Sequence, residues 1–358
     1  MKGSRIPAVK GARDHPGILA RRGEVSQRHC YSPEGHTRTL ESWPREERSI
    51  KMRVASIDIG TNTILLLIAG LDGGKLNPLF EMETIARLGE GVQRNGVLSQ
   101  EAMDRGIETL SQYMRRCRSM GVEQVFAVGT SALREAENSH DFLDRVKEHL
   151  GLTIDIISGE EEALFSFLAV VRDLGESDKS PILVVDVGGG STEFILGKGE
   201  RVCGWVSLPL GAVRFTEQFL FSDPVREEEW QRMEKAIRER LSQIPRAGEP
   251  IKMVAVGGTA TTLASVEQGL NTFVVEKIHR FHLTREALRN QLHLYRSKTI
   301  EKRKNIPGLA PARADVIPAG GAILSMAMEE LQCPSVLVSC HGVRYGVHYK
   351  RLGLGLRA

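Results

Sequence analysis

The sequence has no apolar run that is long enough to cross a membrane. Its longest apolar run is Ile64–Ala69, whereas a transmembrane helix needs about 20 apolar residues. No apolar stretch follows the first lysines either, so the N-terminal part is not typical of a secretory signal. We therefore expect no contact with a membrane.

Cysteine pairs at metal-binding or redox spacing are also missing. The five cysteines are scattered and form no CxxC motif: Cys30, Cys117, Cys203, Cys333 and Cys340. An odd and dispersed set is typical of free thiols in a reducing compartment. The expected location is therefore the cytoplasm.

The body of the chain lacks the positive charge of a nucleic-acid-binding domain. The net charge is +3, but residues 1–51 alone hold eleven Lys or Arg and six Asp or Glu, a surplus of five positive charges. The remainder is close to neutral, which argues against a nucleic-acid partner. Residues 1–51 are also polar, rich in Arg, Gly and Ser, and without helical or strand periodicity. We predict that they form a disordered extension ahead of Met52.

What the sequence does contain is an apolar run that leads into three consecutive glycines. Residues 182–196 read ILVVDVGGGSTEFIL, in which Asp186 precedes the glycines and Glu193 follows two hydroxyl residues. Glycines permit a tight turn that directs backbone N–H groups at an anion, and the hydroxyls add donors. The two acids suit the hydrated Mg²⁺ that a phosphate would bring. Taken alone, the segment also fits an ordinary hairpin.

The same order of residues occurs twice, which favours the phosphate-binding interpretation. Residues 54–69 read VASIDIGTNTILLLIA and align Asp58 with Asp186, at a separation of 186 − 58 = 128 residues. Residues 127–130 (AVGT) and 255–258 (AVGG) keep the same separation. A repeat of this length indicates duplicated domains. We predict an α/β fold with related domains at residues 52–178 and 179–358 and a site in the cleft between them.

These motifs resemble a known family. The DIGTNT and DVGGGSTE hairpins, with the GGTATT turn, are similar to the phosphate-binding elements of the actin/hexokinase/heat-shock-ATPase superfamily. Four further segments resemble the exopolyphosphatase/guanosine pentaphosphate phosphohydrolase family: GTSALREAEN (129–138), ISGEEEA (157–163), LPLGAVRFTE (208–217) and IPGLAPARADVIPAGGAIL (306–324). The resemblance runs from about Met52 to the C-terminus. It implies two duplicated actin-like (ribonuclease H-like) domains, in the short form of the family, and we expect a homodimer.

The resemblance also implies a set of site residues. Glu162 matches the general base and would act with Asp186 and Glu193, while Asp58, Asp186 and Glu193 would hold Mg²⁺. The residues expected to bind substrate are Gly60, Thr61, Asn62, Thr63, Arg87, Arg134, Asn138, Gly188, Gly189, Gly190, Ser191, Arg214, Gly257, Gly258 and Thr259. The implied reaction releases orthophosphate from an end of inorganic polyphosphate, with guanosine pentaphosphate as the alternative substrate.

Several segments also have a purely structural interpretation. Ser158 and Glu161 fit a capping box, and acids in a first helical turn complement the helix dipole. The turn at residues 257–259 either approaches a nucleoside or only holds its helix close. The basic segment 296–313 fits a solvated helix end or a path for an anionic polymer. Residues 339–346 (SCHGVRYG) lack the acids of the family's aspartate and GLREG pattern, so the role of that end stays open.

Two other classes of function share these motifs. A sugar-kinase-like phosphotransferase would need ATP and an acceptor, and a non-catalytic polyphosphate or alarmone sensor would bind without turnover. The acids Asp58, Glu162, Asp186 and Glu193 argue against a sensor, because a binder needs no water-activating carboxylate beside phosphates. We therefore predict a Mg²⁺-dependent exopolyphosphatase.

Overall fold

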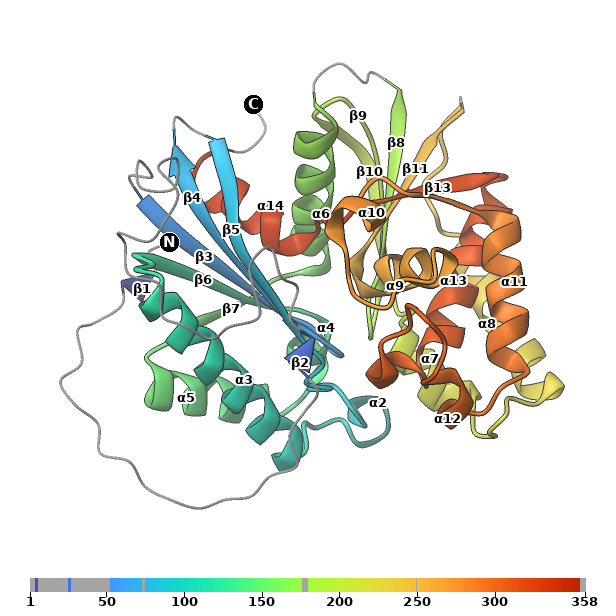
Figure 1. Cartoon of the computed structure of the whole chain (residues 1–358), viewed down its shortest axis with the longest axis horizontal. Helices are drawn as coiled ribbons and strands as arrows, with labels where there is room; N and C mark the ends of the chain where they lie inside the picture. The colour runs from blue at the N-terminus through green and yellow to red at the C-terminus, as the bar shows by residue number, and fades with distance from the viewer. Residues whose placement is uncertain are drawn as a thin grey trace.

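The computed structural model describes residues 52–72, 75–175, 180–248 and 250–354, together with the short strands β1 (Ser4–Arg5) and β2 (Val25–Ser26). Apart from these two strands, residues 1–51 lie outside the described part, so the prediction that they are disordered is not tested. The predicted domain boundary after residue 178 also falls in a gap between described segments. Figure 1 shows two lobes, each built on one sheet.

The two sheets repeat one arrangement of strands. In the first sheet, a central strand pairs antiparallel with the next strand of a meander and parallel with a strand that arrives after a helix. From edge to edge its strands are β7 (Ile154–Ile156), β6 (Gln124–Gly129), β3 (Met52–Ile59), β4 (Ile64–Asp72) and β5 (Lys75–Thr84), with β1 pairing with β6 and β2 with β5.

The second sheet has the same order of pairings and directions. Its strands are β10 (Arg201–Leu208), β9 (Thr192–Lys198), β8 (Pro181–Val187), β11 (Lys252–Val256), β13 (Ser335–Val338) and the added edge strand β12 (His282–Thr284). The central strands β3 and β8 end at Asp58-Ile59 and Asp186-Val187, the positions that the sequence repeat aligns. The prediction of a duplicated α/β fold is confirmed.

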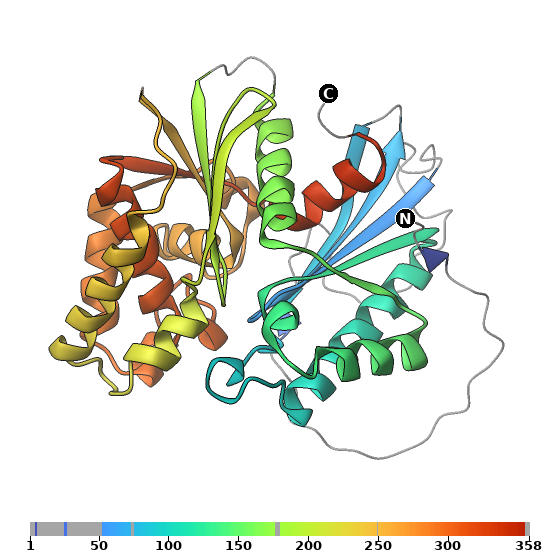
Figure 2. The same ribbon diagram turned by 180° about the vertical axis from the view of Figure 1, so that it is seen from behind.

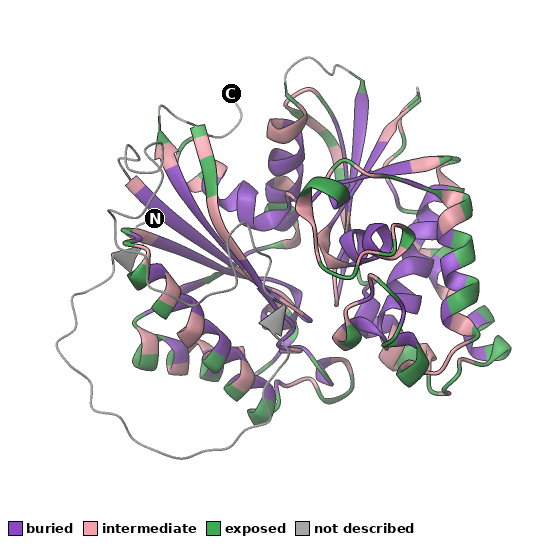
Figure 3. Ribbon diagram, viewed as in Figure 1, coloured by how far each residue is buried: buried purple, intermediate pink, exposed green. Residues whose placement is uncertain are grey.

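Helices cover the outer faces of both sheets. In the first lobe, α3 (Gln100–Ser119) and α5 (Ser139–Leu150) pack on one face and bury a common apolar core. In the second lobe the corresponding helices are α7 (Ala212–Phe219), α8 (Glu227–Leu241), α9 (Gly257–Glu267), α11 (Arg285–Arg296) and α13 (Ile317–Glu330). Figure 3 shows the central strands buried and the outward helix faces exposed.

Two helices lie between the sheets, as the front and back views agree (Figures 1 and 2). These are α6 (Gly159–Leu174) and α14 (Val343–Arg351), which pack against each other. Helix α14 also packs on β3, so the C-terminal segment returns from the second sheet to the first. This crossing places residues 339–346 beside the junction of the two lobes.

Short helices complete the connections. They are α2 (Val92–Asn95), α4 (Ser131–Glu135), α10 (Val275–Ile278), α12 (Ile300–Arg303) and the 3₁₀ turn η2 (Pro311–Arg313). Among the described residues no helix combines the length and the apolar character that crossing a membrane requires.

Candidate active site

The turns of the β3–β4 and β8–β9 hairpins lie against each other between the lobes. In the first turn, Gly60 donates its N–H to the carbonyl of Thr63 at 3.0 Å. In the second turn, Gly188 donates its N–H to the carbonyl of Ser191 at the same distance. A Cβ at Gly190 would lie only 2.3 Å from Oγ of Ser131. A Cβ at Gly189 would lie 2.9 Å from Cβ of Thr61. The bare glycine backbone therefore allows the two turns to approach closely.

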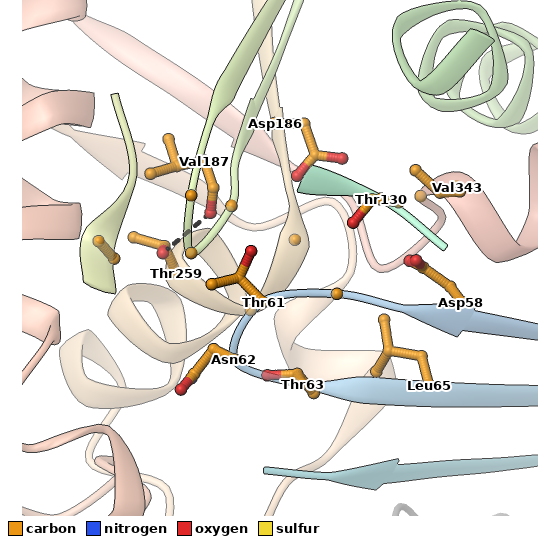
Figure 4. Close-up of a pocket in the computed structure, with 18 of the residues that line it drawn as sticks. Asp58, Thr61, Asn62, Thr63, Leu65, Thr130, Asp186, Val187, Thr259 and Val343 are labelled. Carbon is orange, nitrogen blue, oxygen red and sulfur yellow. Dashed lines mark hydrogen bonds between the residues drawn. The ribbon is translucent and has the colours of Figure 1, made fainter. Parts of the chain in front are cut away.

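A cavity of about 100 Å³ lies at this junction. Its wall includes the predicted turn residues Gly60, Thr61, Asn62, Thr63, Gly188, Gly189, Gly190, Ser191, Gly257, Gly258 and Thr259 together with Asp58, Glu162 and Asp186. Figure 4 shows side chains from both sheets facing this space, including Asp58 from β3 and Asp186 from β8. The structure thus brings together residues that the sequence repeat places 128 positions apart.

The four carboxyl groups that the sequence predicts for the site gather in or just behind the cavity wall, which also includes Glu83. Asp58 and Asp186 come from the ends of the central strands, Glu162 from the first turn of α6, and Glu193 from the start of β9. Ser166 donates a hydrogen bond to Oδ2 of Asp186 at 2.8 Å. Glu193 is buried behind the wall, where it accepts a hydrogen bond from Ser207 at 2.7 Å, and it does not line the cavity.

Burial raises the pKa of each of these acids, and repulsion by neighbouring carboxylates raises it further at Asp58, Glu162 and Glu193. Loss of solvation, followed by the charges of Glu162 and Asp186, raises the pKa of Asp58 to about 8. Loss of solvation raises the pKa of Glu162 to about 7, although the neighbouring Arg134 lowers it. Burial likewise raises the pKa of Asp186, and it raises the pKa of Glu193 well above its usual value. A cluster of this kind is costly unless a cation joins it.

The oxygen atoms of this cluster fit a magnesium ion. Oδ1 of Asp58 is buried and has no hydrogen-bond partner among the described residues, which is expensive for a carboxylate. Mg²⁺ prefers oxygen ligands, binds through one or two carboxylates and completes its shell with water and phosphate. Asp58 and Asp186 line the cavity and fit this role, whereas Glu193 lies behind them.

Comparison with known proteins agrees with this geometry. A model of the Ppx/GppA phosphatase family matches residues 67–354. The chain belongs to this family. It is 34% identical over 312 residues to exopolyphosphatase 2 of Mycobacterium tuberculosis, covering 82% of this chain and 97% of that protein. It is equally 34% identical over 296 residues to a bifunctional 3-dehydroquinate synthase/phosphatase of Fusobacterium nucleatum, covering 80% of this chain but only 44% of the longer relative.

Solved structures of family members share the fold. A Ppx/GppA family member from Aquifex aeolicus superposes with a TM-score of 0.72 at 35% identity, covering 86% of this chain and 99% of that one. An exopolyphosphatase from Cytophaga hutchinsonii gives a TM-score of 0.79 at 27% identity, covering 85% of this chain and 99% of that one. The family resemblance inferred from the motifs is confirmed.

In this Ppx/GppA phosphatase the four predicted substrate-binding side chains outside the turns take different places. Arg134 donates hydrogen bonds from Nη1 to Glu162 at 2.7 Å and to the carbonyl of Ile157 at 2.9 Å. Arg87 has a left-handed backbone (φ 50°) and lines a neighbouring cavity, where it pairs with Asp315 at 2.7 Å. Arg134 therefore contacts Glu162 directly, whereas Arg87 lines the neighbouring cavity and not the first one.

The other two predicted side chains, Arg214 and Asn138, form hydrogen bonds within the protein. Arg214 donates to the carbonyl of Gly190 at 2.6 Å and to both carboxylate oxygens of Glu135 at 2.7 and 2.6 Å, so it ties the glycine turn to α4. Asn138 exchanges hydrogen bonds with the backbone of Leu98 at 2.8 and 3.1 Å and lines a separate surface groove. The structure does not place Asn138 at the cavity.

Two arginines that sequence reasoning did not assign line the cavity of this family member. Arg313 donates to Thr63 at 3.0 Å and to Glu83 at 2.8 Å, linking the second lobe to the first. Arg344, in the C-terminal segment whose role stayed open, is buried and donates to Glu81 at 2.6 Å. The signal for Arg313 lay inside the IPGLAPARADVIP motif, and Arg344 stands at the arginine of the family's GLREG pattern, although that pattern does not show which side chains it meets.

The turn at residues 257–259 closes the cavity on the side of the second lobe. Gly257 has φ +85°, and a Cβ there would lie 2.6 Å from Oδ1 of Asp186. Thr259 donates a hydrogen bond from Oγ1 to the carbonyl of Val187 at 3.1 Å (Figure 4). The turn therefore holds α9 against the end of β8, one of the two interpretations of its sequence.

Proposed function

We propose that this Ppx/GppA phosphatase is a Mg²⁺-dependent exopolyphosphatase. The observation that carries the proposal is the position of Glu162: its carboxylate lines the cavity beside Asp58 and Asp186, opposite glycine turns suited to phosphate. Its pKa of about 7 matches the requirement for a general base that works near neutral pH.

The residues divide the work of hydrolysis between them. Asp58 and Asp186 would hold Mg²⁺, which supplies the positive charge that offsets repulsion between a nucleophile and a phosphate chain. The N–H groups of the two turns and the hydroxyls of Thr61 and Ser191 bind the oxygens of the terminal phosphoryl group. Glu162 takes the proton of the attacking water as the new P–O bond forms and the bond to the rest of the chain breaks. The products are orthophosphate and a chain shorter by one unit.

Arg134 acts on this step through the base. Its Nη1 lies 2.7 Å from Oε2 of Glu162, so it orients the carboxylate and offers a guanidinium to the incoming phosphoryl oxygens. The likeness to exopolyphosphatase 2 of Mycobacterium tuberculosis supports polyphosphate as the first substrate to test. Guanosine pentaphosphate is the alternative.

Orthophosphate release tests the proposal and separates its rivals. Long polyphosphate, short polyphosphate and guanosine pentaphosphate are incubated with the protein, with and without Mg²⁺ and without ATP. Release from polyphosphate that needs Mg²⁺ supports the exopolyphosphatase, and release confined to guanosine pentaphosphate moves the proposal to that substrate. Release only when ATP and an acceptor are supplied favours a phosphotransferase, and binding without release favours a sensor.

We also propose that the enzyme is a cytoplasmic homodimer. None of the four cysteines in the described part of the chain forms a disulfide, which supports a reducing compartment. The homodimer is expected from the family resemblance, and the edge strand β10, on which Trp205 is 42% exposed, is the first surface to test. Light scattering during size-exclusion chromatography measures the oligomeric state, and a monomer at micromolar concentration would contradict it.

A further inference from the structure

A second cavity adjoins the first. It has a volume of about 180 Å³ and shares Thr61, Asn62 and Val316 with the wall of the first cavity. A single water needs roughly 10–15 Å³ of such space, so the cavity can hold more than one further phosphoryl group. The two cavities therefore lie next to each other at the β3–β4 turn.

Most charges that line the second cavity already have partners. Asp315 is bound by both terminal nitrogens of Arg87, at 2.7 and 3.0 Å. Glu90 pairs with Arg105 at 3.0 Å. Because these pairs compensate each other, they leave little net field in the cavity.

Arg94 is different. It is exposed on α2, lines the second cavity and forms no ion pair with any residue in the described ranges. The facing charge is Glu217 on α7, whose Oε1 accepts the N–H of Gly91 at 3.0 Å, one residue before α2 begins. Glu217 therefore holds the N-terminal end of α2, the helix that carries Arg94, through this hydrogen bond.

Asn62 lines both cavities. Its side chain is only 6% exposed, yet neither Oδ1 nor Nδ2 has a hydrogen-bond partner within the described part of the chain. Figure 4 shows this side chain pointing away from Asp58 and Asp186. A buried amide without partners is costly, and a ligand that passes it can satisfy both atoms, directly or through water.

We propose that the second cavity is the subsite for the phosphoryl units that follow the terminal one. The inference rests on the proposed function. The terminal unit lies between the glycine turns, the chain passes Asn62, and Arg94 contacts the phosphoryl oxygens of the units behind it. Arg94 and Asn62 then determine how strongly a longer chain is preferred over a single phosphate.

Equilibrium binding tests the subsite separately from turnover. Orthophosphate, which occupies only the first cavity, and tripolyphosphate, which reaches the second, are titrated with Mg²⁺ into Glu162→Gln protein by calorimetry. Adding Arg94→Gln should weaken tripolyphosphate binding about threefold to tenfold and leave orthophosphate binding unchanged. Adding Glu217→Gln keeps an acceptor for Gly91 but removes a negative charge, so it should tighten tripolyphosphate binding. Both effects should shrink at high salt because Arg94 is exposed.

Arg289→Gln is the matched control, since Arg289 is an exposed arginine on α11 that lines neither cavity. Equal effects of Arg94→Gln on orthophosphate and tripolyphosphate, or no effect on either, would overturn the subsite. In the otherwise wild-type enzyme, Arg94→Gln should raise KM for long chains without lowering kcat. A wild-type protein that binds tripolyphosphate with this pattern but releases no orthophosphate would refute the proposed function and keep the subsite.

Discussion

Nη1 of Arg134 lies 2.7 Å from Oε2 of Glu162, and the same nitrogen donates to the carbonyl of Ile157 just before α6 begins. The guanidinium therefore links α4 to the first turn of α6 and to the residue ahead of its N-cap. A substrate phosphoryl group that attracts Arg134 changes the environment of the carboxylate at the same time. In the proposed mechanism, binding of the anion and activation of water are therefore linked through this contact.

Glu162→Gln should abolish turnover while binding persists. The amide keeps the shape of the side chain but cannot accept the proton of water, and loss of a general base costs on the order of 10²–10⁴ in kcat. Binding of polyphosphate should hold or tighten because a negative charge is removed. The control is Glu160→Gln, on the same helical turn, which should stay near the wild type in a steady-state assay. If Glu162→Gln keeps more than about a tenth of kcat, the base lies elsewhere.

The stability of the metal-free protein should fall as pH rises from about 4 to 8. The native pKa of Asp58 is raised from 3.8 to about 8 and that of Glu162 from 4.5 to about 7. The native state therefore binds more protons than the unfolded chain between these values, and the free energy of unfolding decreases with pH. This stabilisation is complete below the unfolded pKa values and is lost as pH passes through the native ones.

Calorimetric Tm values in EDTA measure this slope. Asp58→Asn should flatten it, whereas Asp144→Asn, at an exposed position on α5, should not change it. Mg²⁺ should raise Tm most at pH 8, where the carboxylates are ionised. A Tm in EDTA that stays constant or rises over this range would contradict the predicted direction.

Arg303 should matter for folding, unlike its neighbour Lys302. The guanidinium is 2% exposed and donates to the carbonyls of Ala314 at 2.7 Å and Lys298 at 3.1 Å. Arg303→Met removes these donors and should lower the free energy of unfolding by about 2–3 kcal/mol in urea titrations. Lys302→Gln, at an exposed site, should change it by less than about 0.5 kcal/mol. Equal effects of the two would show that the buried contacts of Arg303 contribute nothing.

This contrast limits what the sequence could predict about the basic segment 296–313. A run of Lys and Arg predicts a solvated face or a polymer path, but the structure divides it: Lys302 is exposed, Arg303 is a buried structural residue, and Arg313 lines the active-site cavity. Composition does not distinguish these roles, because burial depends on which elements pack over each side chain. Testing a polymer path by neutralising Arg303 would mainly disturb folding.

The duplicated fold and the central acids were predictable for a different reason. A strand that ends in an acid and a glycine turn is a local pattern, and its repeat places Asp58 and Asp186 at equivalent ends of two sheets. Arg344 matches the arginine of the GLREG pattern, but its place at the cavity was not predictable, because it depends on α14 crossing back to the first sheet, where Oγ of Ser56 donates to its carbonyl at 2.7 Å. Long-range contacts of this kind follow from tertiary packing rather than from local sequence.

Gly257→Ala should damage both the fold and the site. The residue has φ +85°, which is strained for alanine, and the added Cβ would lie 2.6 Å from Oδ1 of Asp186. We expect a loss of about 1–3 kcal/mol in the free energy of unfolding. We also expect weaker Mg²⁺ binding in calorimetric titrations, because the carboxylate must move. Gly248→Ala is the matched control, since a Cβ there meets nothing within 4 Å and the backbone is not left-handed. A Gly257→Ala protein that binds Mg²⁺ like the control would mean that Asp186 can shift without cost, and its role as a fixed metal ligand would have to be abandoned.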